Sequence, residues 1–304
     1  MRKERILYTF LLSAIFIAVT GYFLPEPPSS RMKAERFWAY KTHTLKKFDI
    51  ICIGDSRIYR GLSPDAMKKV LPDYNILNLG YSNGGLNDPL FSEATKKLDE
   101  KSNTRIIVIG ITPASLTEEA SQNEHLKQEL RRKKTEVYQR IYLHPYLQFF
   151  EPTKPNVIID SIFNHQKTNN YYEHFTKCGF VGGRKDKYDT NEALESYRKQ
   201  FLREQVSEAV ILNLMDQIQK WKMKGIQVYG YRPPSTEKME ILENEMSGFN
   251  EESFIEQFKN AGGIWIEIDM QNLRSYDGSH LDEESAEKVS KELAKKIRPI
   301  ESLI

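Results

Sequence analysis

Cysteine is scarce in this chain of 304 residues, which contains only Cys52 and Cys178. Two cysteines cannot build the disulfide framework that stabilises small secreted domains. Cys52 lies inside the apolar run 48–53, where a small buried hydrophobic residue is the ordinary interpretation, and a single Cys52–Cys178 bridge stays open. The sequence therefore excludes a disulfide scaffold.

The chain also lacks an excess of charge of either sign, because 44 Lys and Arg residues face 42 Asp and Glu residues, a net charge of +2. This balance provides no field that would hold a phosphate backbone, so no nucleic acid is expected as a partner. Charged residues make up 28% of the chain, and the mean hydropathy is −0.58. A polytopic membrane protein is thus excluded, and the length suits one large domain or two small ones.

Long apolar runs are missing with one exception, 6–24, which carries no charge over 19 residues. At about 1.5 Å per residue it would span the hydrocarbon core, so we expect one transmembrane anchor. The positive charges in the tail 1–5 favour a cytoplasmic N-terminus, a single pass through the cytoplasmic membrane and an extracytoplasmic body, although Arg31, Lys33 and Arg36 follow the run. A cleaved signal peptide is the alternative, which the length of the run disfavours.

Short apolar runs alternate with helical patterns after a proline-containing spacer over 25–46. Five runs that stop at turns predict buried strands: 48–53, 74–79, 105–111, 227–231 and 264–268. Helical patterns cover 64–70, 87–98, 192–224, 237–260 and 282–297. This alternation predicts a three-layer α/β/α domain with a parallel sheet over 47–298. The span 116–224 predicts a largely helical insertion, which contains a basic stretch, 127–140, and an aromatic stretch, 138–150.

Three residues far apart in the sequence have the types needed for nucleophilic catalysis. Ser56 follows the first strand, at the carboxyl edge of the sheet where open α/β folds place their ligands. Asp277 and His280 share the loop between the last strand and the last helix, at the same edge. A serine becomes a nucleophile when a base accepts its proton and an acid orients that base. Ser56 as a helix cap with Asp55 as a turn residue is the structural alternative.

The motifs around these residues resemble those of a known family, the SGNH (GDSL-type) hydrolases. Gly54-Asp55-Ser56, Gly80 and Asp277-Gly278-Ser279-His280 are similar to its first, second and last blocks, and the resemblance covers about 47–298. It implies a flavodoxin-like fold, Ser56 as nucleophile, His280 as base and Asp277 as the orienting acid. It also implies that the backbone N–H groups of Ser56 and Gly80 stabilise the oxyanion.

The third block departs from the family. The usual Gly-x-Asn-Asp after the third strand is replaced by Gly110-Ile111-Thr112-Pro113, so the asparagine oxyanion donor is missing. Asn83 and Arg57 are candidates to replace it. Arg232, at the end of the fourth strand, is a candidate substrate contact, with a structural turn as the alternative. His125, His144, His165 and His174 lack zinc spacing, so neither a metal nor another cofactor is predicted.

This departure, the N-terminal anchor and the segment 277–286 are similar to membrane-anchored SGNH proteins of bacterial envelopes, related to alginate O-acetylation and D-alanyl-lipoteichoic acid transfer proteins. The resemblance implies a serine esterase or O-acyltransferase that acts on an extracytoplasmic glycan or a lipid-linked acyl substrate. A multi-spanning O-acyltransferase is the implied partner. The alternative is a non-catalytic envelope protein of this fold that binds glycan or such a partner. A flavin or nucleotide binder is disfavoured because the first turn is no phosphate loop.

Overall fold

Five parallel strands form the central sheet of the protein. The computed structural model describes residues 2–23, 30–82, 84–147 and 171–297. The strands are β1 (Ile50–Ile53), β2 (Ile76–Asn78), β3 (Ile106–Gly110), β6 (Gln227–Tyr231) and β7 (Ile264–Trp265). Their order is β2-β1-β3-β6-β7, and Ile50 lies opposite both Ile76 and Ile106. All five predicted strands are confirmed, and the order matches the flavodoxin-like doubly wound sheet.

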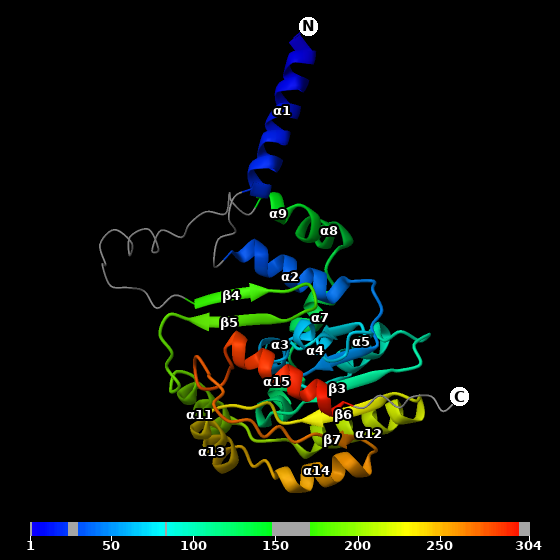
Figure 1. Ribbon diagram of the computed structural model, residues 1–304, viewed down its shortest axis with the longest axis vertical. Coiled ribbons are helices and arrows are strands. Elements are labelled where there is room, and N and C mark those ends of the chain that lie inside the picture. The colour runs from blue at the N-terminus through cyan, green and yellow to red at the C-terminus, as the bar shows by residue number, and fades with distance from the viewer. Residues whose placement is uncertain (1, 24–29, 83, 148–170, 298–304) are drawn as a thin grey trace.

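Helices cover both faces of this sheet. On one face Ile51 and Ile107 pack with side chains of α5 (Asp88–Lys97), α12 (Glu208–Met223) and α14 (Glu251–Asn260). On the other face Cys52 and Val108 pack with side chains of α3 (Ser56–Gly61), α4 (Pro64–Lys68) and α15 (Glu283–Lys296). Cys52 and Cys178 are both free thiols, so the Cys52–Cys178 disulfide that the sequence left open is not formed. The predicted three-layer α/β/α architecture is confirmed (Figure 1).

Two of the predicted long helices are each divided in two. The pattern 192–224 forms α11 (Leu194–Arg203) and α12, and the pattern 237–260 forms α13 (Glu237–Met246) and α14. Gly248 ends α13 with φ +72°, a left-handed conformation that favours glycine. Asn250 then caps α14 by accepting the N–H of Ser253 at 3.0 Å. The prediction of continuous helices is wrong here because the apolar periodicity continues across the break.

The insertion contains a second sheet that was not predicted. Strands β4 (Tyr171–Phe175) and β5 (Val181–Lys185) pair antiparallel. The described helices of the insertion are α6 (Glu118–Ser121), α7 (His125–Leu130), α8 (Lys134–Tyr142), α9 (His144–Leu147), α11 and α12, and the short 3₁₀ helix η1 (Pro113–Leu116) leads into it. A Cβ on Gly183 of β5 would lie 2.7 Å from the Tyr276 ring, so glycine permits close packing of this strand. The hairpin thereby reaches the loop that carries Asp277 and His280.

A helix also lies inside the expected spacer 25–46. Ser30 caps helix α2 (Arg31–His43), because its hydroxyl accepts the N–H of Lys33 at 3.2 Å. The helix lies above the β4–β5 hairpin in Figure 1, and its residues Phe37 and Lys41 are buried. The spacer therefore contributes to the folded body. Its apolar residues are too few for the helical periodicity to stand out.

Helix α1 (Arg2–Phe23) projects away from the body (Figure 1). Its side chains Ile6, Phe10 and Phe16 are 67%, 71% and 72% exposed. The anchor predicted over 6–24 lies partly outside the described residues, namely residue 24 and the side chains at 18 and 21–23. Across the described ranges, no helix combines the length and the apolar character needed to cross a membrane.

Candidate active site

Ser56 is the first residue of α3 and lies just beyond the carboxyl end of β1. Asp55 caps α3, because its Oδ1 accepts the N–H of Arg57 at 2.9 Å, while the Thr112 hydroxyl donates to its Oδ2. Gly54 has φ +147°, and a Cβ there would lie 2.4 Å from Ile58 and 2.9 Å from the carbonyl oxygen of Gly110. This tight turn holds the Ser56 hydroxyl at the sheet edge.

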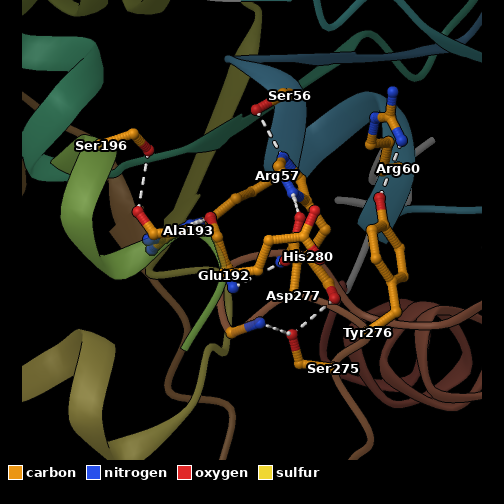
Figure 2. A network of polar contacts seen from close by, with 12 residues as sticks. Ser56, Arg57, Arg60, Glu192, Ala193, Ser196, Ser275, Tyr276, Asp277 and His280 are labelled. Carbon is orange, nitrogen blue, oxygen red and sulfur yellow. Dashed lines mark hydrogen bonds and ion pairs between the residues drawn. The ribbon is translucent and has the colours of Figure 1, made fainter. Parts of the chain in front are cut away.

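Ser56, His280 and Asp277 form a continuous chain of hydrogen bonds (Figure 2). His280 Nε2 lies 2.8 Å from Ser56 Oγ, and His280 Nδ1 lies 2.7 Å from Asp277 Oδ2. Asp277 Oδ1 accepts the backbone N–H groups of Ser279 at 2.9 Å and His280 at 2.7 Å. The Tyr276 ring stacks on the imidazole with a centroid distance of 5.9 Å. The structure thus places serine, base and acid in the order that nucleophilic catalysis requires.

The charge of Asp277 is stabilised by its neighbours. Burial raises the pKa of its carboxyl, but the hydrogen bond and charge of His280, together with the two backbone donors, outweigh burial and lower the pKa to about 2. Asp277 is therefore ionised at neutral pH. An ionised carboxylate fixes the Nδ1–H tautomer of His280 and stabilises the imidazolium that forms when His280 accepts a proton.

Two cavities meet at the Ser56–His280 pair. One, of about 550 Å³, extends past Ala193 and Ser196. The other, of about 650 Å³, extends past Arg60 and Tyr276. Figure 2 shows these two pairs on opposite sides of His280. Both cavities are lined by the same four residues at their junction: Ser56, Glu192, Asp277 and His280.

Arg57 lies next to the nucleophile but lines neither cavity. Its Nε donates to Ser279 Oγ at 3.0 Å, and its Nη2 donates to Glu243 Oε1 at 2.6 Å. The side chains of Arg57 and Glu243 are 2% and 0% exposed. A buried guanidinium requires such partners, and they direct it into the protein. The expectation that Arg57 supplies an oxyanion donor is therefore not supported by its orientation.

Gly80 occupies the loop after β2, but its N–H is engaged elsewhere. It donates to Asn78 Oδ1 at 2.9 Å, and Gly80 lines neither cavity, so its predicted oxyanion role does not fit this geometry. Ser82 and Gly84 of the same loop do line the cavities. The other predicted donor, the N–H of Ser56, belongs to the first turn of α3, where amides lack intrahelical acceptors.

The two remaining candidates are not brought to Ser56. Asn83 lies outside the described residues. Arg232 pairs with Glu243 at 3.0 Å and Glu251 at 2.5 Å, and it lines a separate cavity of about 630 Å³ to which Ser56 does not contribute. The structural alternative considered for Arg232 thus describes its contacts better than substrate binding does.

Among the cavity residues that the sequence did not predict are four charged or aromatic ones near Ser56: Arg60, Lys185, Glu192 and Tyr276. The sequence could have indicated two of them, because Arg60 lies about one helical turn after Ser56 and Tyr276 directly precedes Asp277. Lys185 ends the unpredicted strand β5, and Glu192 lies in the turns that follow it. Neither has a local pattern that indicates a site.

No protein-family model and no curated protein matches this sequence. Among solved structures, an inhibitor-bound aryl esterase of M. smegmatis is 10% identical over 83% of this chain and 97% of its own, with a TM-score of 0.35. A carbohydrate acetylesterase from Sinorhizobium meliloti is 12% identical over 81% of this chain and 96% of its own, with a TM-score of 0.33. These are distant likenesses.

Proposed function

We propose that this chain is a serine esterase or O-acyltransferase of the SGNH hydrolase type. The proposal rests on the hydrogen-bonded chain Ser56–His280–Asp277 at the carboxyl edge of a parallel sheet. The two adjoining cavities provide room for both parts of an ester around Ser56.

The geometry supports a two-step acyl transfer. Ser56 Oγ forms a bond to the acyl carbon while His280 Nε2 accepts its proton, and the carbonyl electrons move to the oxygen. The tetrahedral intermediate expels the alcohol, which takes the proton from His280, and leaves an acyl-Ser56. Water or an acceptor hydroxyl then attacks this acyl group while His280 accepts its proton, and the second tetrahedral intermediate expels Ser56 Oγ, which takes that proton back from His280. The Ser56 N–H, in the first turn of α3, is the proposed backbone donor for the oxyanion.

The proposed setting is the outer side of the cytoplasmic membrane, where α1 anchors the chain. Support comes from the exposed apolar side chains along α1, such as Ile6, Phe10 and Phe16, and from the positive charges before them. The proposed substrate is an acylated glycan or a lipid-linked acyl group, with a multi-spanning O-acyltransferase as partner. Membrane fractionation of the full chain with alkaline extraction tests the anchor. Release at alkaline pH would contradict it.

Intact-mass labelling with a fluorophosphonate tests the activated serine. The full chain in detergent is expected to gain one adduct, whereas Ser56→Ala and His280→Ala gain none. Ser253→Ala, at an exposed serine of α14, is the matched control and should label as the parent does. Absence of any adduct in folded parent protein would overturn the proposal.

Such an absence would favour the second candidate, a non-catalytic protein of this fold that binds glycan or a membrane partner. The observation that favours this candidate is the third block, where Thr112 takes the place of the family's asparagine and its hydroxyl donates to the Asp55 carboxylate.

A further inference from the structure

Two cations line the cavity on the Tyr276 side of Ser56. Arg60 and Lys185 have side chains that are 17% and 12% exposed. The Arg60 guanidinium lies 5.3 Å from the Tyr171 ring centroid, and Lys185 Nζ lies 5.9 Å from the same centroid and 5.7 Å from that of Tyr276. The aromatic rings therefore hold both cations on one wall of the cavity.

Arg60 is fixed in place and retains unused donors. Its Nε donates to the Tyr59 hydroxyl at 2.8 Å, its Nη1 to the Tyr276 hydroxyl at 2.8 Å, and its Nη2 to Glu173 Oε1 at 3.1 Å. A guanidinium has five N–H donors, and over the described ranges the chain supplies no acceptor for the other two. These two remain available to a ligand.

Lys185 pairs with a more exposed partner. Both carboxylate oxygens of Glu192 contact its Nζ, and the Glu192 side chain is 48% exposed against 12% for Lys185. Ion pairs at an exposed carboxylate contribute little free energy, so an incoming anion can displace Glu192 from Lys185. The other carboxylates nearby are already engaged, Glu173 with Arg60 and Asp277 with His280.

We propose that this cavity binds an anionic group of the ester substrate, a carboxylate or a phosphate, between Arg60 and Lys185. Glu192 occupies the place of that anion on Lys185 in the unliganded protein. The proposal rests on the proposed function in one respect, because Ser56 and His280 complete the same cavity. Charge-assisted hydrogen bonds from a fixed guanidinium and an ammonium recognise either anion, and they would align the ester with Ser56.

Calorimetric binding to the full-length Ser56→Ala variant tests the site without requiring turnover. Benzoate and phenyl phosphate are the anionic probes, and benzamide is the neutral probe of similar shape. Each anion is expected to bind about tenfold or more tightly than benzamide, and the tighter of the two identifies carboxylate or phosphate. Lys185→Gln and Arg60→Gln should remove the preference. Lys199→Gln, at an exposed lysine of α11, should retain it.

Glu192→Gln gives the sharpest contrast, because removing the competing carboxylate should tighten anion binding. A purely structural Lys185–Glu192 pair predicts no such gain. With Ser56 restored, the ratio of kcat/KM for 4-acetoxybenzoate over 4-acetoxybenzamide should follow the same order among the Arg60, Lys185, Glu192 and Lys199 variants. Equal binding of benzamide and both anions, or an unchanged preference in Lys185→Gln, would overturn the proposal. Anion binding without labelling of the parent at Ser56 would instead sustain the site and refute the proposed esterase.

Discussion

The Nε of Arg57 donates to the hydroxyl oxygen of Ser279 over 3.0 Å, which joins the residue after Ser56 to the residue before His280. The hydroxyl of Ser279 in turn donates to the Tyr197 hydroxyl at 2.8 Å. The rest of the guanidinium is held by the buried carboxylate of Glu243. The approach of His280 to Ser56 therefore depends on a buried ion pair behind the site.

Replacing Arg57 by Met should destabilise the fold and slow the labelling of Ser56. The stability loss is expected to be about 3 kcal/mol, because Glu243 loses the more deeply buried of its two cationic partners and keeps only Arg232. Labelling should slow by about tenfold or more, since Ser279 loses its hydrogen bond from Arg57 and the His280 loop is held less firmly in its alignment. Urea unfolding and the fluorophosphonate rate measure the two effects.

A double variant separates positioning from stability. Arg57→Met with Glu243→Leu replaces the pair by apolar side chains and should recover much of the stability, while Arg232 keeps Glu251 as its partner. Labelling should stay slow. Recovery of both properties would show that Arg57 contributes only to stability.

Asp277→Asn should cost stability in a pH-dependent manner. The pKa of Asp277 is about 2 in the folded protein, below the value of about 3.9 expected in the unfolded chain. Its contribution, about 2 kcal/mol, is present above the unfolded pKa and is lost as the pH falls through the folded pKa. The stability gap to the variant should therefore be largest near neutral pH and shrink below about pH 4. Urea unfolding from pH 7 to pH 3 measures it, and a constant gap would contradict the assignment.

Lys41→Met should weaken the link between α2, the Gly80 loop and the hairpin. Lys41 is 1% exposed, and its Nζ donates to the carbonyl oxygens of Gly80 at 2.5 Å and Gly179 at 3.0 Å. Loss of both bonds should cost about 2 kcal/mol. Burial lowers the pKa of Lys41 well below its usual value, so the unfolded chain binds the proton more tightly. Stability relative to the variant should consequently rise from pH 7 toward pH 10, and a falling gap would refute this.

Gly80→Ala and Gly61→Ala form a matched pair near Ser56. A Cβ on Gly80 would lie 2.8 Å from the Tyr59 backbone nitrogen and 3.0 Å from the Ile58 Cβ, so the loop and α3 must move apart. We expect a loss of about 1 to 3 kcal/mol and slower labelling. A Cβ on Gly61 meets nothing within 4 Å, so that variant should label normally and change stability by less than about 1 kcal/mol. Thermal unfolding and labelling rates measure the pair, and equal behaviour would contradict the packing argument.

The five strands and the positions of Ser56, Asp277 and His280 were predictable because they depend on local properties. Apolar runs and the turns that end them are read within a few residues, and parallel strands bring their carboxyl ends to one edge. Strand β5 was not predictable in this way. Its sequence is rich in glycine, and Gly182 and Gly183 suit a strand only because Glu283 and Tyr276 pack closely against them.

Arg57 shows most clearly what could be predicted from the sequence and what could not. Its place next to Ser56 follows from the chain, which suggested a role toward the substrate. Its direction depends on Glu243, 186 residues later, whose buried carboxylate accepts the hydrogen bonds of the inward-turned guanidinium. The order and periodicity of the apolar runs thus specify the sheet and the edge that carries Ser56, because these are properties of neighbouring residues in the sequence. Contacts between segments far apart in the sequence decide which side chains face the cavities, because a buried charge is stable only when an opposite charge from another segment lies beside it.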